Sequence, residues 1–255
     1  MGHRHLLAAC AAELVGTAVL VGVGLSVVIV ASAPHGPLAS VLPSLAARRA
    51  LTGGLFGAVG MTVTLSPVGR VSGAHLNPAV SFAFWCEGTL PGAALLGYVA
   101  AQLTGAVLGA LPLLAFGSLG QQVAYGATMP GPAGIGPAYL GETLTTFVLV
   151  ATVVVFVAHP RLRAWTPCTL PPMYGLMVWL EAAYSGTSTN PARSLGPAVV
   201  SGQWHAYWLY WAAPLTGSLL AVAARHLVPG LKELEVEVAR VAHFEARRPW
   251  PPPRR

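Results

Sequence analysis

The chain has 255 residues, of which 55% are hydrophobic and only 9% are charged. Soluble domains carry about 25% charged residues, so this chain has too little charge to cover a water-facing surface. The composition excludes most soluble enzymes, disordered chains and collagen-like chains, and it makes the lipid bilayer the expected solvent. The formal net charge is +6. In a membrane protein such a surplus is more typical of cytoplasmic loops than of a nucleic-acid partner, and we expect no nucleic acid here.

Six apolar stretches approach the length that a helix needs to cross the hydrocarbon, which is about 20 residues. They are Leu6–Ala33, about Ala50–Val68, Gly92–Phe116, Tyr139–Ala158, about Leu170–Tyr184 and His205–Leu227. The first is too long and too lightly basic at its start for a cleaved signal peptide, so we interpret it as a retained helix.

Two further apolar stretches, Asn77–Cys86 and Asn190–Val200, are too short to span, and each begins with Asn-Pro. Asn as the N-cap, followed by Pro at the first helical position, is a strong helix-start signal. Each stretch therefore predicts a half-helix. A membrane protein tolerates a half-helix only where it lines a cavity or is buried in protein.

The positions of Lys and Arg predict the orientation and the domain limits. Most of them fall in connections on the same side of the membrane as the N-terminus, whereas Arg48 and Arg49 fall in a connection on the other side. This asymmetry predicts that both termini are cytoplasmic. We expect one membrane domain over residues 1–230 and a basic, Pro-rich cytoplasmic tail over 231–255, either solvated or bound to anionic lipid. The Gly-, Ala- and Pro-rich composition suggests a bacterial inner (plasma) membrane.

The chain also repeats itself. Ala12–Leu20, with Glu13, matches Gly141–Leu149, with Glu142, and Ser72–Val80 matches Ser185–Arg193. Each half, about 6–116 and about 138–228, holds three of the predicted spans. An odd number of spans makes the two halves insert with opposite topology, so a site built by both halves lies near the midplane of the membrane.

At this point the residues resemble a known family. Two Asn-Pro-Ala boxes, Ala-Glu near the start of the first helix and Asn-Pro-Ala-Arg-Ser in the second half are similar to the aquaporin (major intrinsic protein) family. The resemblance covers about Ala12–Leu227. It implies an all-α membrane fold of six transmembrane helices plus two re-entrant half-helices in an inverted repeat. It further implies a homotetramer in the lipid bilayer that is a channel and not an enzyme, with no cofactor.

The two boxes, Asn77-Pro78-Ala79 and Asn190-Pro191-Ala192, are predicted to line the pore. Each half-helix N-terminus carries roughly half a positive charge, and two that face one point repel cations and protons in a low dielectric. The amides of Asn77 and Asn190 can also donate hydrogen bonds to a passing oxygen. A water held by two donors relays protons poorly. A plain capping role for both asparagines is compatible with this prediction.

The resemblance implies that Arg193 is the arginine of a selectivity filter near the outer mouth; the alternative is a structural salt bridge to a Glu. Counting from the boxes places Gly57, Val178 and Thr187 at the other filter positions. An alternative register moves the first of these to Val59, and the adjacent Phe56 is a candidate to intrude. Gly57 and Val178 lack the aromatic ring and the His of water-selective members, so we expect a wider, less polar filter. Ser194 stands where glycerol facilitators carry Asp.

The matched acids Glu13 and Glu142 need partners inside a membrane. The resemblance implies that they support the half-helices by accepting hydrogen bonds from the re-entrant loops; a proton relay is the alternative. We expect His75 to brace the inner vestibule, because no second His lies at metal-ligand spacing. For Glu181 we expect bracing of the second loop, with direct solute contact as the alternative. Cys10, Cys86 and Cys168 are far apart and predict neither a disulfide framework nor a metal site.

These features predict a passive channel for water and small uncharged solutes such as glycerol, urea or metalloid hydroxides, which excludes ions and protons. One alternative is a glycerol or metalloid facilitator with little water flux. Another is an ion-coupled inverted-repeat transporter that uses Glu13 and Glu142. An intramembrane enzyme finds no supporting motif in the sequence, and a non-conducting scaffold on the same fold is a further alternative.

Overall fold

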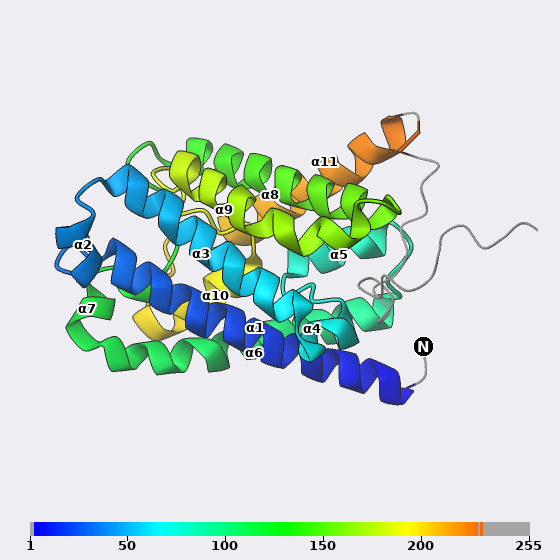
Figure 1. The fold of residues 1–255 in the computed structure, drawn as a ribbon, viewed down its shortest axis with the longest axis horizontal. Helices are drawn as coiled ribbons and strands as arrows, with labels where there is room; N and C mark the ends of the chain where they lie inside the picture. The colour runs from blue at the N-terminus through cyan, green and yellow to red at the C-terminus, as the bar shows by residue number, and fades with distance from the viewer. Residues whose placement is uncertain (1–2, 229, 232–255) are drawn as a thin grey trace, which may run out of the picture.

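The computed structural model describes residues 3–228 and 230–231, and every regular element in that part of the chain is a helix (Figure 1). Six of the helices are long, as the sequence predicts: α1 (His3–Ser32), α3 (Leu45–Leu65), α6 (Gly92–Ala110), α8 (Ile135–Ala158), α9 (Thr166–Glu181) and α11 (Leu209–Leu227). The expected tail falls almost wholly outside the described residues.

The two predicted half-helices are present as α5 (Pro78–Cys86) and α10 (Pro191–Ser201). The remaining elements are short: α2 (Pro37–Val41), α4 (Pro67–Ser72), η1 (Leu111–Phe116), α7 (Gly117–Gln121), η2 (Ala124–Gly126) and η3 (Arg163–Trp165). The uncharged connection between the third and fourth long helices is therefore partly helical rather than a simple loop.

Local sequence signals explain where several of these helices begin. The Ser44 hydroxyl accepts a hydrogen bond from the amide of Ala47 at the start of α3, and Ser66 caps α4 in the same way. Pro67, Pro78 and Pro191 occupy the first turns of α4, α5 and α10, where a missing N–H costs nothing.

Length and hydropathy alone single out three membrane-spanning candidates among the described residues: Arg4–Ser32, Gly92–Gln121 and Ile135–Ala158. The other three long helices do not qualify by this criterion. Helix α9 has only 16 residues and carries Pro171 and Pro172, and α3 begins with Arg48 and Arg49 in its first turns. Their place in the bundle follows from packing rather than from hydropathy.

The two ends of the described chain lie at the same end of the molecule (Figure 1). The start of α1 and the end of α11 are found there, whereas α2 and α7 lie at the opposite end. We call the end with the termini the inner end and the other the outer end. A chain that crosses the membrane an even number of times begins and ends on the same side, as this one does.

Glycines let the long helices approach closely. Gly105 and Gly109 of α6 press against the backbone of α1, and a Cβ on either would lie 2.2 Å from a carbonyl oxygen of Leu14 or Ala18. In the second repeat, Gly217 of α11 meets the backbone of α8 in the same manner. Helices α3 and α9 join the two repeats, and their contact depends on Gly53 and Gly57. Small residues at helix interfaces are the usual way to pack helices in a membrane.

A buried ion pair fixes the inner end of the first half-helix. Arg225 Nη1, in the last turn of α11, lies 2.7 Å from Glu87 Oε2 at the end of α5, and the Glu87 side chain is 2% exposed. The Ser218 hydroxyl of α11 also donates to the carbonyl of Ala79 over 2.9 Å. Helix α5 is therefore held to α11 at both of its ends.

The close contact between α3 and α9 makes a prediction about stability. A Cβ at Gly57 would lie 2.4 Å from the Leu170 carbonyl oxygen, whereas a Cβ at Gly54 would come no closer than 3.8 Å to any neighbour. We expect Gly57→Ala to lower the thermal unfolding temperature in detergent by several degrees, because overpacking costs about 1–3 kcal/mol. Gly54→Ala is the matched control and should unfold close to the wild type. Equal unfolding temperatures for the two variants would contradict the packing described here.

Candidate functional site

The two Asn-Pro-Ala boxes form the starts of α5 and α10. Asn77 caps α5 with its side-chain oxygen, which accepts from the Ala79 amide over 2.8 Å. Asn190 caps α10 by accepting from the amides of Ala192 and Arg193. Pro78, Ala79, Pro191 and Ala192 are all buried.

Each asparagine also reaches across to the loop of the other repeat. Asn77 Nδ2 donates to the carbonyl oxygen of Thr189, and Asn190 Nδ2 donates to that of Leu76, both over 2.8 Å. A side-chain amide has two N–H groups, so one on each asparagine remains for another acceptor. Both asparagines line the same cavity, which extends toward the inner end and which we call the inner cavity.

The loops ahead of the boxes have the same unusual backbone in both repeats. In the first, Gly73, Ala74 and Leu76 have positive φ; in the second, their counterparts Gly186, Thr187 and Thr189 do. A non-glycine residue in this left-handed region costs roughly 1–2 kcal/mol. The repeat seen in sequence is therefore a repeat of conformation, and something must hold both loops in this shape.

Glu13 and Glu142 hold the loops, in matching geometry. Glu13 accepts from the backbone amides of His75 (2.9 Å) and Leu76 (2.6 Å). Glu142 accepts from those of Ser188 (2.6 Å) and Thr189 (2.7 Å). Both carboxylates have no exposed surface. They supply acceptors to N–H groups that would otherwise be unpaired in an apolar interior.

A further side chain completes each carboxylate site. Gln102 Nε2 donates to Glu13 over 2.7 Å, and the Ser185 hydroxyl donates to Glu142 over 2.5 Å. His75 lines the inner cavity; its Nδ1 lies 3.1 Å from the Ser81 hydroxyl, and its ring stacks on Phe84.

A second cavity opens toward the outer end, between the end of α1, the start of α3 and the end of α9. We call it the outer cavity. Three of the four predicted filter residues meet there: Val178, Thr187 and Arg193. Arg193 is 5% exposed. Its Nη1 donates to the Gly126 carbonyl over 2.7 Å rather than to a carboxylate, and no ion pair of Arg193 occurs among residues 3–228.

Gly57, the fourth predicted filter position, lies elsewhere. Its backbone borders the inner cavity, but a Cβ there would meet the main chain of Leu170 and Pro171 at 2.8 Å or less. Gly57 thus faces α9, and no side chain at this position can enter the outer cavity. The adjacent Phe56 enters it instead.

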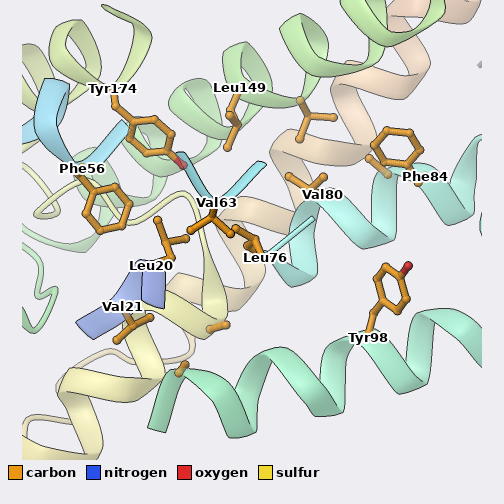
Figure 2. Close-up of a cluster of buried hydrophobic side chains, with 14 of the residues drawn as sticks. Leu20, Val21, Phe56, Val63, Leu76, Val80, Phe84, Tyr98, Leu149 and Tyr174 are labelled. Atoms are coloured by element: carbon orange, nitrogen blue, oxygen red, sulfur yellow. The ribbon is translucent and has the colours of Figure 1, made fainter. Parts of the chain in front are cut away.

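Phe56 and Tyr174 separate the two cavities and line both of them. The two rings, from α3 and α9, lie next to each other (Figure 2), with centroids 5.6 Å apart. The Phe56 ring also lies 5.9 Å from the guanidinium carbon of Arg193, and the Tyr174 hydroxyl lies 3.1 Å from that of Thr189. The narrow point between the cavities is therefore an aromatic pair placed between Arg193 and the boxes.

Sequence reasoning did not identify Tyr174, and it named Phe56 only as a neighbour of the counted position. A usable signal exists for Tyr174, because it lies one helical turn before Val178 on the same face of α9. Glu181 contacts the second loop: the Thr187 hydroxyl donates to its carboxylate over 2.5 Å.

Comparison with known proteins agrees with this geometry. The family model described as "Major intrinsic protein" matches residues 2–224. "Probable aquaporin TIP4-2" of Oryza sativa subsp. japonica is 40% identical over 185 residues, which is 68% of this chain and 67% of that protein. "Aquaporin-4" of Bos taurus is 36% identical over 163 residues, covering 60% of this chain but only 48% of the bovine protein.

Among solved structures, the X-ray structure of the aquaglyceroporin from Plasmodium falciparum superposes with a TM-score of 0.68. The superposition covers 88% of this chain and 96% of that chain at 20% identity, so it shows a shared fold. It confirms the predicted fold of six long helices and two half-helices. The chain belongs to the major intrinsic protein family of integral membrane channels, and it is a water or small-solute channel rather than an enzyme.

Proposed function

We propose that this protein is a passive channel for water and small uncharged solutes, and that it excludes ions and protons. The observation that carries the proposal is the arrangement of the two cavities. They extend toward opposite ends, meet at Phe56 and Tyr174, and are bordered by Asn77 and Asn190 on one side and Arg193 on the other.

The boxes account for the exclusion of cations. Helices α5 and α10 both direct their N-termini at the point where Asn77 and Asn190 cross. The partial positive charge of each helix end and the full charge of Arg193 raise the energy of a cation at that level. The remaining N–H of each asparagine offers a hydrogen bond to the oxygen of a neutral solute.

The filter of this proposal consists of Phe56, Val178, Thr187 and Arg193, with Phe56 in place of the expected Gly57. Phe56 supplies the aromatic wall that counting alone left out. Arg193 and Thr187 supply polar groups, while Val178 keeps the remaining wall apolar. Such a filter suits water and solutes of the size of glycerol or urea.

The ion-coupled transporter is not favoured by any contact of the intramembrane acids. Glu13 and Glu142 each use both carboxylate oxygens on loop amides. Neither acid lines the inner or the outer cavity. A carboxylate committed in this way supports the scaffold, and we assign that role to Glu13, Glu142 and, through its ring contacts, His75.

The surroundings of the channel follow from its exposed residues. Val15, Val19 and Val23 form an exposed apolar stripe on α1, and Leu140, Leu144 and Val148 form its counterpart on α8. We propose that these stripes face lipid or neighbouring subunits of a homotetramer, and that residues 1–230 form the channel domain with both termini cytoplasmic. The relatives reported above are plant and mammalian, so they lend no support to a bacterial membrane.

Flux measurements on proteoliposomes test the proposed function. After an osmotic step with sucrose, light scattering should show faster shrinkage than in protein-free vesicles, and a pH-sensitive dye should show no added proton leak. The control is Ala182→Trp, which places a large ring in the outer cavity and should abolish the added flux. If wild-type vesicles match empty ones for water, glycerol and urea alike, the channel proposal is wrong.

Removal of the Phe56 ring tests the narrow point. Phe56→Ala should raise glycerol permeability several-fold while water permeability changes little, because the ring limits the size of the solute rather than its hydrogen bonding. Phe82→Ala removes an equal ring that lies outside both cavities and packs at a tilt against Trp85, so it should leave the ratio unchanged. Parallel changes of water and glycerol in Phe56→Ala would contradict this assignment.

Replacement of Arg193 tests charge exclusion. Arg193→Val should admit a measurable cation or proton current, because a buried positive charge repels cations strongly where the dielectric is low. Arg193→Lys keeps the charge and should keep the exclusion. Vesicle currents measured under an imposed potential distinguish the two variants. If neither variant carries a cation or proton current, Arg193 is not the residue that excludes charge.

A further inference from the structure

Glu181 is an intramembrane acid that the scaffold does not require. It lies in the last turn of α9 and is 6% exposed. The first repeat has no acid anywhere from Leu45 to Asn77. Its loop nevertheless adopts the same backbone, with φ of 51° at Ala74 against 54° at the matching Thr187. The loop shape is therefore achieved without a counterpart of Glu181.

What distinguishes the second loop is the side chain that Glu181 contacts. The first repeat has Ala74, which has no hydroxyl, where the second has Thr187. The Thr187 hydroxyl donates to Glu181 Oε2 over 2.5 Å. The Thr187 backbone amide is satisfied separately by the Ser185 hydroxyl over 3.1 Å. The carboxylate thus fixes the direction of the Thr187 hydroxyl, which has no equivalent at Ala74 in the first loop.

The contact decides how Thr187 faces the outer cavity. A hydroxyl has one proton and two lone pairs. When its proton is directed at Glu181, the Thr187 oxygen has only acceptor capacity left for the cavity that it lines with Arg193. Arg193 is a donor without acceptor capacity. The cavity therefore presents a fixed acceptor beside a fixed donor.

The contact with Thr187 leaves the other oxygen of Glu181 without a hydrogen bond of its own within the described part of the chain. Glu181 Oε1 is buried and has no hydrogen-bond partner among the described residues. It is packed against Gly141, where a Cβ would lie 2.5 Å away. An unpaired buried carboxylate oxygen is unfavourable. We therefore expect the other oxygen, Oε2, to have a function that offsets this cost.

We infer that Glu181 is a positioning residue. It holds the Thr187 hydroxyl as a hydrogen-bond acceptor. The channel therefore favours solutes whose hydroxyl or amide groups both donate and accept, such as polyols and urea-like amides, more than the same filter would without Glu181. The inference rests on the proposed channel function and extends it to the choice of solute.

The test compares glycerol and water permeabilities in proteoliposomes. Glu181→Leu frees the Thr187 proton and should lower the glycerol-to-water ratio about threefold to tenfold, the range expected for one hydrogen bond. Glu181→Gln retains an acceptor oxygen and should keep the ratio near that of the wild type. Thr187→Val should lower the ratio as Glu181→Leu does, and the double variant should show no further drop. Thr146→Val, which removes a buried hydroxyl outside both cavities, is the matched control.

Two flux outcomes would overturn the inference: an unchanged ratio in Glu181→Leu, or a further drop when it is added to Thr187→Val. Infrared spectroscopy tests the contact without flux, since Thr187→Val should shift a carboxyl band that disappears in Glu181→Leu. Absence of that shift would overturn the positioning role. Wild-type vesicles without added flux would instead overturn the proposed function, while the infrared result would still report the contact.

Discussion

The arrangement of the pore depends on how two stretches of non-helical backbone are satisfied inside an apolar bundle. The loops before Asn77 and Asn190 contain left-handed residues and leave consecutive N–H groups without helical partners. Neither lipid nor a neighbouring strand can accept them at that depth. Glu13 and Glu142 solve the problem identically, because the two oxygens of one carboxylate match two successive amides. With the loops fixed, the half-helices begin at defined points and face each other.

The same arrangement produces the electrostatics of the channel. Two helix N-termini directed at one point repel each other, so they need a tie that holds them together. The reciprocal bonds from each asparagine to the opposite loop provide that tie at 2.8 Å, while the carboxylates lie on the far side of the loops. The positive ends therefore remain uncompensated toward the inner cavity. The proposed exclusion of cations and the tie between the two repeats therefore depend on one set of contacts.

The parts of this structure that sequence reasoning could predict are those set by local signals or by the repeat. Asn-Pro marks the half-helices, and matching of the repeats pairs Glu13 with Glu142. Boundaries such as the start of α3 at Leu45 depend on a cap at Ser44, which hydropathy does not register. The side chain that enters the outer cavity depends on the rotation of α3, where one residue corresponds to about 100°. Counting from Asn77 gives the right depth but selects Gly57, which the close contact with Leu170 turns toward α9; Phe56 then faces the cavity.

The differences between the repeats indicate where selectivity is located. Val80 and Arg193 occupy matching positions after their boxes, but Val80 lines the inner cavity and Arg193 the outer one. Ala74 and Thr187 match in the same way, and Glu181 has no equivalent. The carboxylates and asparagines that build the loops and boxes are alike in both halves, whereas Thr187 and Arg193 are matched in the first half by Ala74 and Val80, which offer no polar side chain. These differences support the proposal that solutes are selected in the outer cavity and that the inner cavity, bordered by Leu76 and Val80, is an entrance to the boxes.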